Sequence, residues 1–299
     1  GSLRTPAGYC GVVGFRPSPG VVPSEVRPIG LIPFSLLGPM GRTVEDTILL
    51  LEAQSGIDNR DPFSSKFNSD LNKKQNDIDL SKVKAAFSIN LGEAPISKDY
   101  QTLFLKKISK FKHCFHKAHE LDPNFKNGHE AFEILRGVNF VAAHGERVNK
   151  YRELLSPNVI DNVDRGLKYS LHDVSNAFLQ QNKIALDFIN FFQDVDVLIC
   201  PAASITPFPH NEWFVKEIDG KKMPTYMRWL AMTYLPTMAL ACSIVLPCGL
   251  DNNKMPFGIQ IIGPPGSDRK ILNIAQSIEK LLEIDDFTKR PIPELNFKS

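Results

Sequence analysis

Short apolar runs set between helical stretches are the feature that most limits the folds open to this chain of 299 residues. The clearest run is 196–200, Asp-Val-Leu-Ile-Cys, which a proline follows at once. Two more runs lie at 243–246 and 257–262, and a weaker alternating run lies at 83–89. Short runs of this kind predict buried strands. Because the runs are interspersed with helices, the sequence predicts an α/β fold.

Helical patterns occupy much of the sequence between these runs. Thr43 and the acids Glu45 and Asp46 form an N-cap and an acidic first turn, which favour a helix start. Gly56 offers a C-cap for the same helix. The other predicted helices are 99–120, 128–150, 173–192 and 268–282. We expect them to form layers against the strands.

Two segments are predicted to lack regular structure. Gly and Pro recur through the first forty residues, which predicts an extended, turn-rich path rather than helix. The same segment is too apolar to be a disordered linker, so we expect it to cover a core. Residues 58–79 are polar and predict an exposed connection.

Charge and hydropathy argue against several classes of partner. The net charge of +2 predicts no nucleic-acid partner and no membrane partner, since both usually need a concentrated basic surface. The longest apolar run, 234–250, contains two prolines and is too short to span a bilayer comfortably. The five cysteines show no paired spacing, which favours a reducing compartment, and we expect a cytoplasmic protein.

Two side-chain clusters have both a structural and a functional interpretation. His113, His116 and His119 are spaced like neighbours on one helix face, but flanking lysines would oppose a cation, so we expect no metal site. An aromatic and sulfur-rich group precedes the long apolar run and fits core packing or the wall of an acyl pocket. Its members are Tyr226, Met227, Trp229 and Tyr234.

Several blocks of the sequence resemble, in order, the motifs of the amidase signature family. The first is Gly-Ser-Leu-Arg-Thr-Pro-Ala at 1–7, which is similar to the family's nucleophile segment. The others lie at 17–23, 37–46, 56–62, 196–201 and 247–264. Residues from about 91 to 195 match only loosely. The resemblance therefore rests on the blocks that flank this middle region.

This resemblance implies a serine amidohydrolase with a Ser–Ser–Lys triad and no cofactor. Ser2 falls at the position of the nucleophile, although its local pattern alone would suggest only a turn or a cap. Gly1 falls in the loop whose amides receive the oxyanion. Arg4 is expected to form a structural ion pair, and Cys10 is expected to be a small buried residue. The lysine and the second serine lie N-terminal to this segment in the family.

The resemblance also implies a mixed central sheet flanked by helices, with the N-terminal part of the fold absent. We expect one amidase domain over 1–299, divided into 1–57, a mainly helical layer at 80–195 and a sheet-forming part at 196–285. The implied partner is a small-molecule amide, and a homodimer is possible; the substrate-binding residues are unknown. The isolated segment is expected to be inactive and poorly soluble.

Two other functions remain open at this stage. The chain resembles the glutaminase (A) subunit of a tRNA amidotransferase, which shares the signature and needs a partner protein. A degenerate, non-catalytic scaffold is the other alternative. The acyl and amine specificity cannot be inherited from a relative, because Leu-Ala-Cys-Ser at 240–243 departs from the family pattern.

Overall fold

The computed structural model describes residues 1–25, 29, 32–64 and 78–293. Its centre is a seven-stranded sheet in the order β2-β1-β8-β9-β5-β3-β4. The strands are β1 (Val13–Arg16), β2 (Met40–Gly41), β3 (Lys84–Phe87), β4 (Lys117–Glu120), β5 (Val197–Pro201), β8 (Cys242–Leu250) and β9 (Pro256–Gly263). A separate hairpin joins β6 (Glu217–Ile218) and β7 (Lys221–Lys222).

The central sheet is mixed, as the resemblance implied. β3 runs parallel to β4 and to β5. The pairs β5–β9, β9–β8, β8–β1 and β1–β2 are antiparallel. All four strands predicted from apolar runs are present, so the α/β prediction is confirmed.

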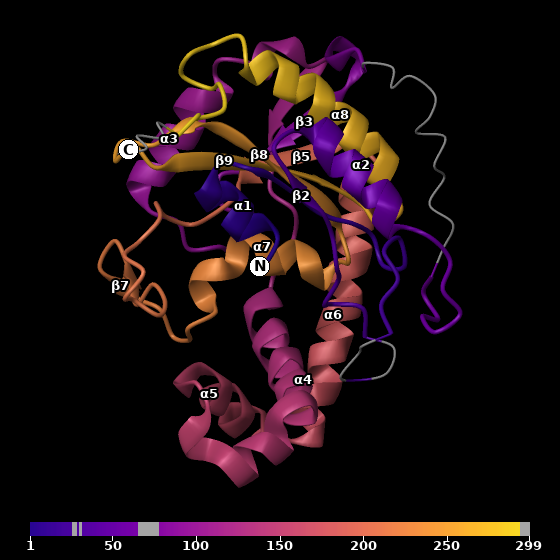
Figure 1. Ribbon diagram of the computed structural model, residues 1–299, viewed down its shortest axis with the longest axis vertical. Helices are drawn as coiled ribbons and strands as arrows, with labels where there is room; N and C mark the ends of the chain where they lie inside the picture. Colours follow the sequence, from indigo (N-terminus) through magenta and orange to yellow (C-terminus); the bar gives the residue numbers. More distant parts are fainter. Residues whose placement is uncertain (26–28, 30–31, 65–77, 294–299) are drawn as a thin grey trace, which may run out of the picture.

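Helices cover both faces of this sheet (Figure 1). One face packs against α2 (Val44–Gln54), α3 (Lys98–Ile108) and α8 (Asp268–Leu282). The other packs against α4 (Gly128–Tyr151), α6 (Leu171–Phe191) and α7 (Ala231–Met238), while α5 (Pro157–Gly166) lies against α4. Alternation along β5 serves both cores, because Ile199 faces the first layer and Leu198 the second.

The turn-rich prediction for the first forty residues is wrong at its start. A short helix, α1 (Arg4–Cys10), follows Ser2 directly, and β1 comes next. Pro6 fits this helix because a proline in the first turn removes no intrahelical hydrogen bond. The described residues from 17 to 39 contain neither helix nor strand. Of the polar connection predicted at 58–79, residues 65–77 lie outside the described ranges.

Two further helix predictions need correction. α2 has the predicted cap, with Thr43 Oγ1 accepting from the Asp46 amide at 3.0 Å, but it ends at Gln54 because Ser55 adopts an extended backbone. The helix predicted over 99–120 ends at Ile108 and is followed by β4. Phe111 and Phe115 pack on Phe87 of β3, so their apolar spacing belongs to a separate segment beside a strand.

No helix in the described ranges has both the length and the apolar character that a bilayer crossing requires.

Candidate active site

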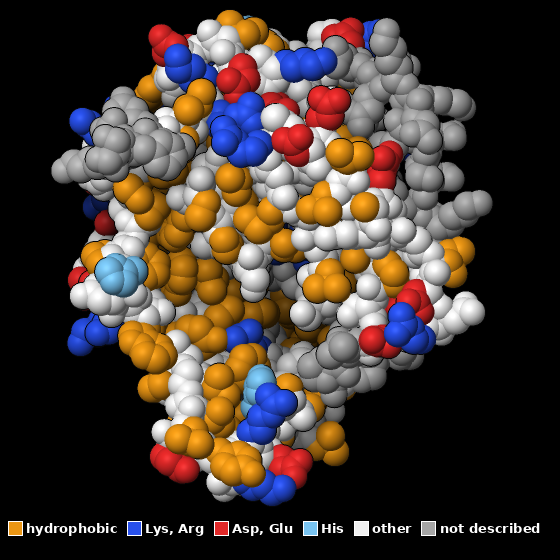
Figure 2. Space-filling view, viewed as in Figure 1, with side chains coloured by type: hydrophobic (Ala, Val, Ile, Leu, Met, Phe, Trp, Pro, Cys, Tyr) orange, Lys and Arg blue, Asp and Glu red, His pale blue; other side chains and the backbone are white. Residues whose placement is uncertain are grey.

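A cavity of about 590 Å³ opens beside the start of α1, between the sheet and the helices α4 and α7. Figure 2 shows hydrophobic side chains gathered around a hollow in the middle of this face. Ser2 and Gly1 both line the cavity and are exposed at its edge. The structure thus puts the two residues that the sequence singled out at one accessible hollow.

Close packing positions α1, and with it Ser2. A Cβ on Gly14 of β1 would lie 2.7 Å from Ala7 Cβ and 2.8 Å from the Leu3 carbonyl oxygen. On the other side, a Cβ on Gly258 of β9 would lie 2.8 Å from Gly8 Cα. Only glycine allows the helix to approach both strands this closely.

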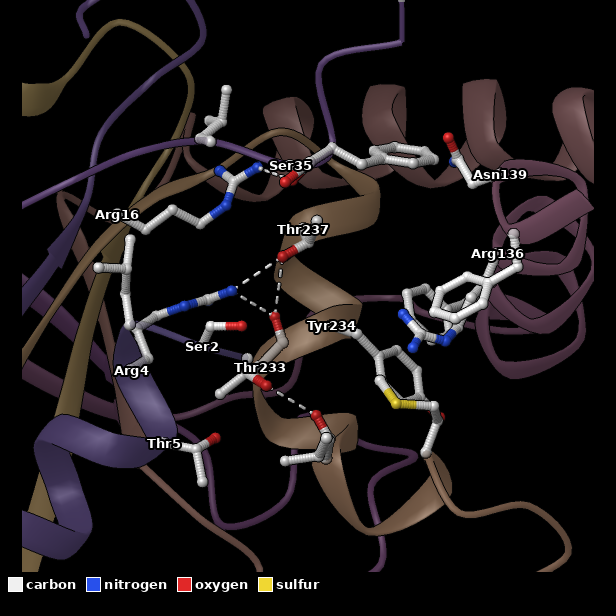
Figure 3. Close-up of a pocket in the computed structure, with 18 of the residues that line it drawn as sticks. Ser2, Arg4, Thr5, Arg16, Ser35, Arg136, Asn139, Thr233, Tyr234 and Thr237 are labelled. Carbon is white, nitrogen blue, oxygen red and sulfur yellow. Dashed lines mark hydrogen bonds between the residues drawn. The ribbon is translucent and has the colours of Figure 1, made fainter. Parts of the chain in front are cut away.

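Arg4 fastens α1 to the cavity wall. Its Nη1 donates to Gln260 Oε1 at 2.7 Å, and its Nη2 donates to the Thr233 carbonyl at 2.6 Å and to Thr237 Oγ1 at 2.8 Å. These partners belong to β9 and α7 (Figure 3). The ion pair expected for Arg4 is therefore wrong, because neutral oxygens satisfy the buried guanidinium instead of a carboxylate.

Arg16 is a second buried guanidinium in the cavity wall. It donates to the Ala241 carbonyl at 2.5 Å and to the Phe34 carbonyl at 3.3 Å. Burial lowers the pKa of Arg16 to about 10 and lowers the pKa of Arg4 well below its ordinary value. Both guanidiniums add positive potential near Ser2.

The lining of the cavity has no acidic side chain among the described residues. Its charged or ionisable members are Arg4, Arg16, Arg136 and His144, together with the tyrosines of its wall. Its described serines are Ser2 and Ser35, and no described side chain forms a hydrogen bond with Ser2 Oγ. The site is therefore cationic around an accessible hydroxyl.

Aromatic rings form much of the remaining wall. Tyr226, Met227, Trp229 and Tyr234 all line the cavity, which agrees with the pocket-wall interpretation of this group. Tyr234 also stacks on Phe132 at 3.9 Å between ring centres, so it serves the core as well. Its hydroxyl lies 2.5 Å from His129 Nδ1, and His129 Nε2 lies 2.8 Å from the Glu93 carbonyl.

Other predicted residues lie away from this site or differ from expectation. Cys10 is exposed at the end of α1, so its predicted burial is wrong. His113, His116 and His119 lie in and around the segment that leads into β4, not on a helix face. Within the described residues, no group of three or more potential metal ligands occurs.

Sequence reasoning missed three residues that shape the site, Gln260, Arg16 and Arg136. A glutamine in the middle of the apolar run 257–262 was the available signal, because a buried polar side chain needs a partner. The two arginines gave no comparable signal, since their neighbours in space come from distant parts of the chain.

Comparisons with known proteins agree with this geometry. The sequence profile of the Amidase family matches residues 1–272. An acylamidase of Rhodococcus erythropolis is 25% identical over 99% of this chain, and the A subunit of a Glutamyl-tRNA(Gln) amidotransferase from a Nostoc species is 28% identical over 94%. A crystal structure of a bacterial aryl acylamidase superposes with a TM-score of 0.78 at 22% identity, covering 92% of this chain and 59% of that one.

The fold and the sequence thus lead to the same family. The chain spans 62% of the length of both curated relatives. The match to the Amidase profile covers most of the chain, and the structural similarity extends over the central sheet and its helices. This chain belongs to the amidase signature family.

Proposed function

We propose that the protein containing this chain hydrolyses a carboxamide and that Ser2 is its nucleophile. The observation that carries the proposal is the position of Ser2, exposed at a cavity of about 590 Å³ beside a helix that Arg4 anchors. A hydroxyl at the edge of a concave, largely apolar site is well placed to meet a small-molecule amide.

The reaction proceeds through an acyl-enzyme. Ser2 Oγ gives up its proton through a second serine to a neutral lysine, the two residues that the family resemblance implies, and attacks the amide carbon. The C–O bond forms as the carbonyl oxygen becomes an oxyanion, which the loop amides at Gly1 receive. The C–N bond then breaks, the amine leaves with the proton, and water releases the acid from Ser2.

The cationic wall supports this chemistry. Arg4 and Arg16 lie buried near Ser2 without a carboxylate partner among the described residues. Nearby positive potential disfavours protonation of a lysine and so keeps it basic near neutral pH. The same potential stabilises the oxyanion that develops in the transition state.

Amide turnover by the intact protein tests the proposal. Ser2→Ala is expected to lower kcat by about 10³-fold or more, because removal of a nucleophile leaves only binding and oxyanion stabilisation. Ser35→Ala is the matched control, since Ser35 lines the same cavity. Equal activity of wild type and Ser2→Ala would contradict the proposal.

A glutaminase subunit is a second candidate. The relative of that name in Nostoc is 28% identical to this chain, slightly more than the acylamidase. Glutamine hydrolysis that needs a co-purifying second subunit would favour it, whereas turnover of simple aryl amides by the protein alone would favour the acylamidase type.

We also propose a cytoplasmic location. All five cysteines are free thiols, and three of them are buried, which fits a reducing compartment. Fractionation of cells that express the intact protein tests this proposal.

A further inference from the structure

Arg136 of α4 lies in the cavity wall opposite Ser2, Arg4 and Arg16, with Tyr234 between the two sides (Figure 3). Its Nε donates to Asn162 Oδ1 at 2.9 Å, and its Nη2 donates to the Tyr226 hydroxyl. The guanidinium also lies 4.2 Å from the centre of the Phe140 ring. These contacts fix the plane of the guanidinium, while Nη1 and one N–H of Nη2 have no partner among the described residues.

The positive charge of Arg136 has no carboxylate counter-ion in the part of the chain that the structure describes. The nearest carboxylates behind it already pair with other arginines, Glu133 with Arg228 at 2.7 Å and Asp161 with Arg165 at 2.8 Å. Burial lowers the pKa of Arg136, which reflects the cost of holding its charge away from water. An anion that accepts from the unused N–H groups would recover part of that cost.

The space between Ser2 and Arg136 is walled by apolar and aromatic groups. Phe132 and Tyr234 are stacked at 3.9 Å with nearly parallel rings, and Phe140 lies beside Arg136. A ligand that reaches both ends therefore needs an apolar, preferably flat, middle portion.

We propose that the substrate is an amide whose far end carries a carboxylate, bound by Arg136 while the scissile carbonyl lies at Ser2. This inference rests on the proposed amide hydrolysis and specifies its substrate class. Arg136 acts as the specificity-determining residue: it selects the anionic substrate, and the aromatic wall accommodates the spacer.

Two amides that differ only at the far end test this inference. They are 4-carbamoylbenzoate, which carries the carboxylate, and 4-hydroxymethylbenzamide, which is neutral. With the intact protein, kcat/KM is expected to be at least about tenfold higher for 4-carbamoylbenzoate, the gain typical of a charge-assisted hydrogen-bonded pair. Arg136→Met should remove this preference and leave turnover of the neutral amide within about twofold.

Two other variants serve as comparisons. Arg147→Met removes an exposed arginine from the same helix, outside the cavity, and should change neither amide. Arg136→Lys keeps the charge but loses the planar pair of donors, so an intermediate preference is expected. Retained turnover of the neutral amide shows that each variant is folded.

The outcomes separate this inference from the proposed function. If wild type shows no preference, or if Arg136→Met slows both amides equally, Arg136 is only a structural clamp and the inference is overturned. If neither amide is hydrolysed, the proposed function fails, and calorimetric titration with 4-carbamoylbenzoate then decides the inference. Binding that Arg136→Met weakens at least about tenfold supports it, and binding that the variant leaves unchanged overturns it.

Discussion

At the scale of single residues, this site depends on guanidinium groups held by neutral oxygens. Arg4 and Arg16 use their hydrogen bonds on carbonyl, hydroxyl and amide oxygens of the wall rather than on carboxylates. The arrangement keeps the net charge of the cavity positive while each arginine stays in one orientation. A carboxylate partner would cancel the potential that the proposed reaction uses.

Arg4→Met is expected to destabilise the chain by on the order of 3 kcal/mol. The change leaves Gln260 Oε1 and Thr237 Oγ1 buried without their charged donor. Urea unfolding monitored by circular dichroism measures the loss. Arg147→Met, at an exposed position, should lie within about 0.5 kcal/mol of wild type. An Arg4→Met midpoint equal to that of the control would show that the guanidinium does not fasten α1.

His129 makes stability depend on pH. Burial lowers the pKa of His129, and its two nitrogens already bind Tyr234 and Glu93. Because the unfolded chain takes up this proton at about pH 6.5 and the folded chain only at lower pH, its contribution is complete above about pH 6.5 and falls below it.

Urea midpoints at pH 7.5 and 5.0 test this dependence. His129→Gln should lose less stability than wild type between the two values, whereas His172→Gln, at an exposed position, should lose as much as wild type. The interpretation of His129 would be wrong if His129→Gln kept the full loss.

At the scale of elements, the site is a junction of α1, α7 and the strands β1 and β9. Glycine at positions 8, 14 and 258 lets α1 lie directly on the sheet. Arg4 then ties the start of the helix to α7 and β9. Displacement of α1 would therefore move Ser2 relative to the cavity.

Gly14→Ala is expected to cost about 1–3 kcal/mol, because its new methyl would overlap Ala7 and the Leu3 carbonyl. Gly145→Ala is the matched control in α4. There the methyl meets only Val141 Cγ1 at 3.8 Å, so this substitution should stabilise by about 0.5–1 kcal/mol. Thermal unfolding of both variants checks the opposite signs, and equal effects would contradict the packing argument.

The sequence predicted elements well where local signals were strong. The buried strands and the Thr43 cap are confirmed because apolar runs and caps act over a few residues. The segment near Phe115 was assigned to a helix, since periodicity cannot tell one helix from two short pieces. Arg136 could not be placed in the site at all, because its contacts with Asn162 and Tyr226 join distant parts of the chain.

At the scale of the whole molecule, one sheet joins two cores. Ile199 and Leu198 are adjacent on β5, fully buried, and belong to the cores on opposite faces. The cavity lies on the Leu198 side, where α4 and α7 meet the start of α1. The rigidity of the site therefore depends on both layers.

Leu198→Ala and Ile199→Ala are each expected to destabilise by about 2–5 kcal/mol, the cost of a cavity in a packed core. Because β5 is shared, both should shift the same unfolding transition. Far-ultraviolet circular dichroism and tryptophan fluorescence, recorded together, should give coincident curves for each variant. Two separated transitions, one for each face, would contradict the shared-sheet account.

Covalent labelling of Ser2 tests the central claim most directly. The intact protein is treated with a fluorophosphonate and digested, and the modified peptide is identified by mass spectrometry. We predict one adduct on Ser2 Oγ, absent in Ser2→Ala and retained in Ser35→Ala. An unmodified Ser2, under conditions that label a known family member treated in parallel, would contradict the account.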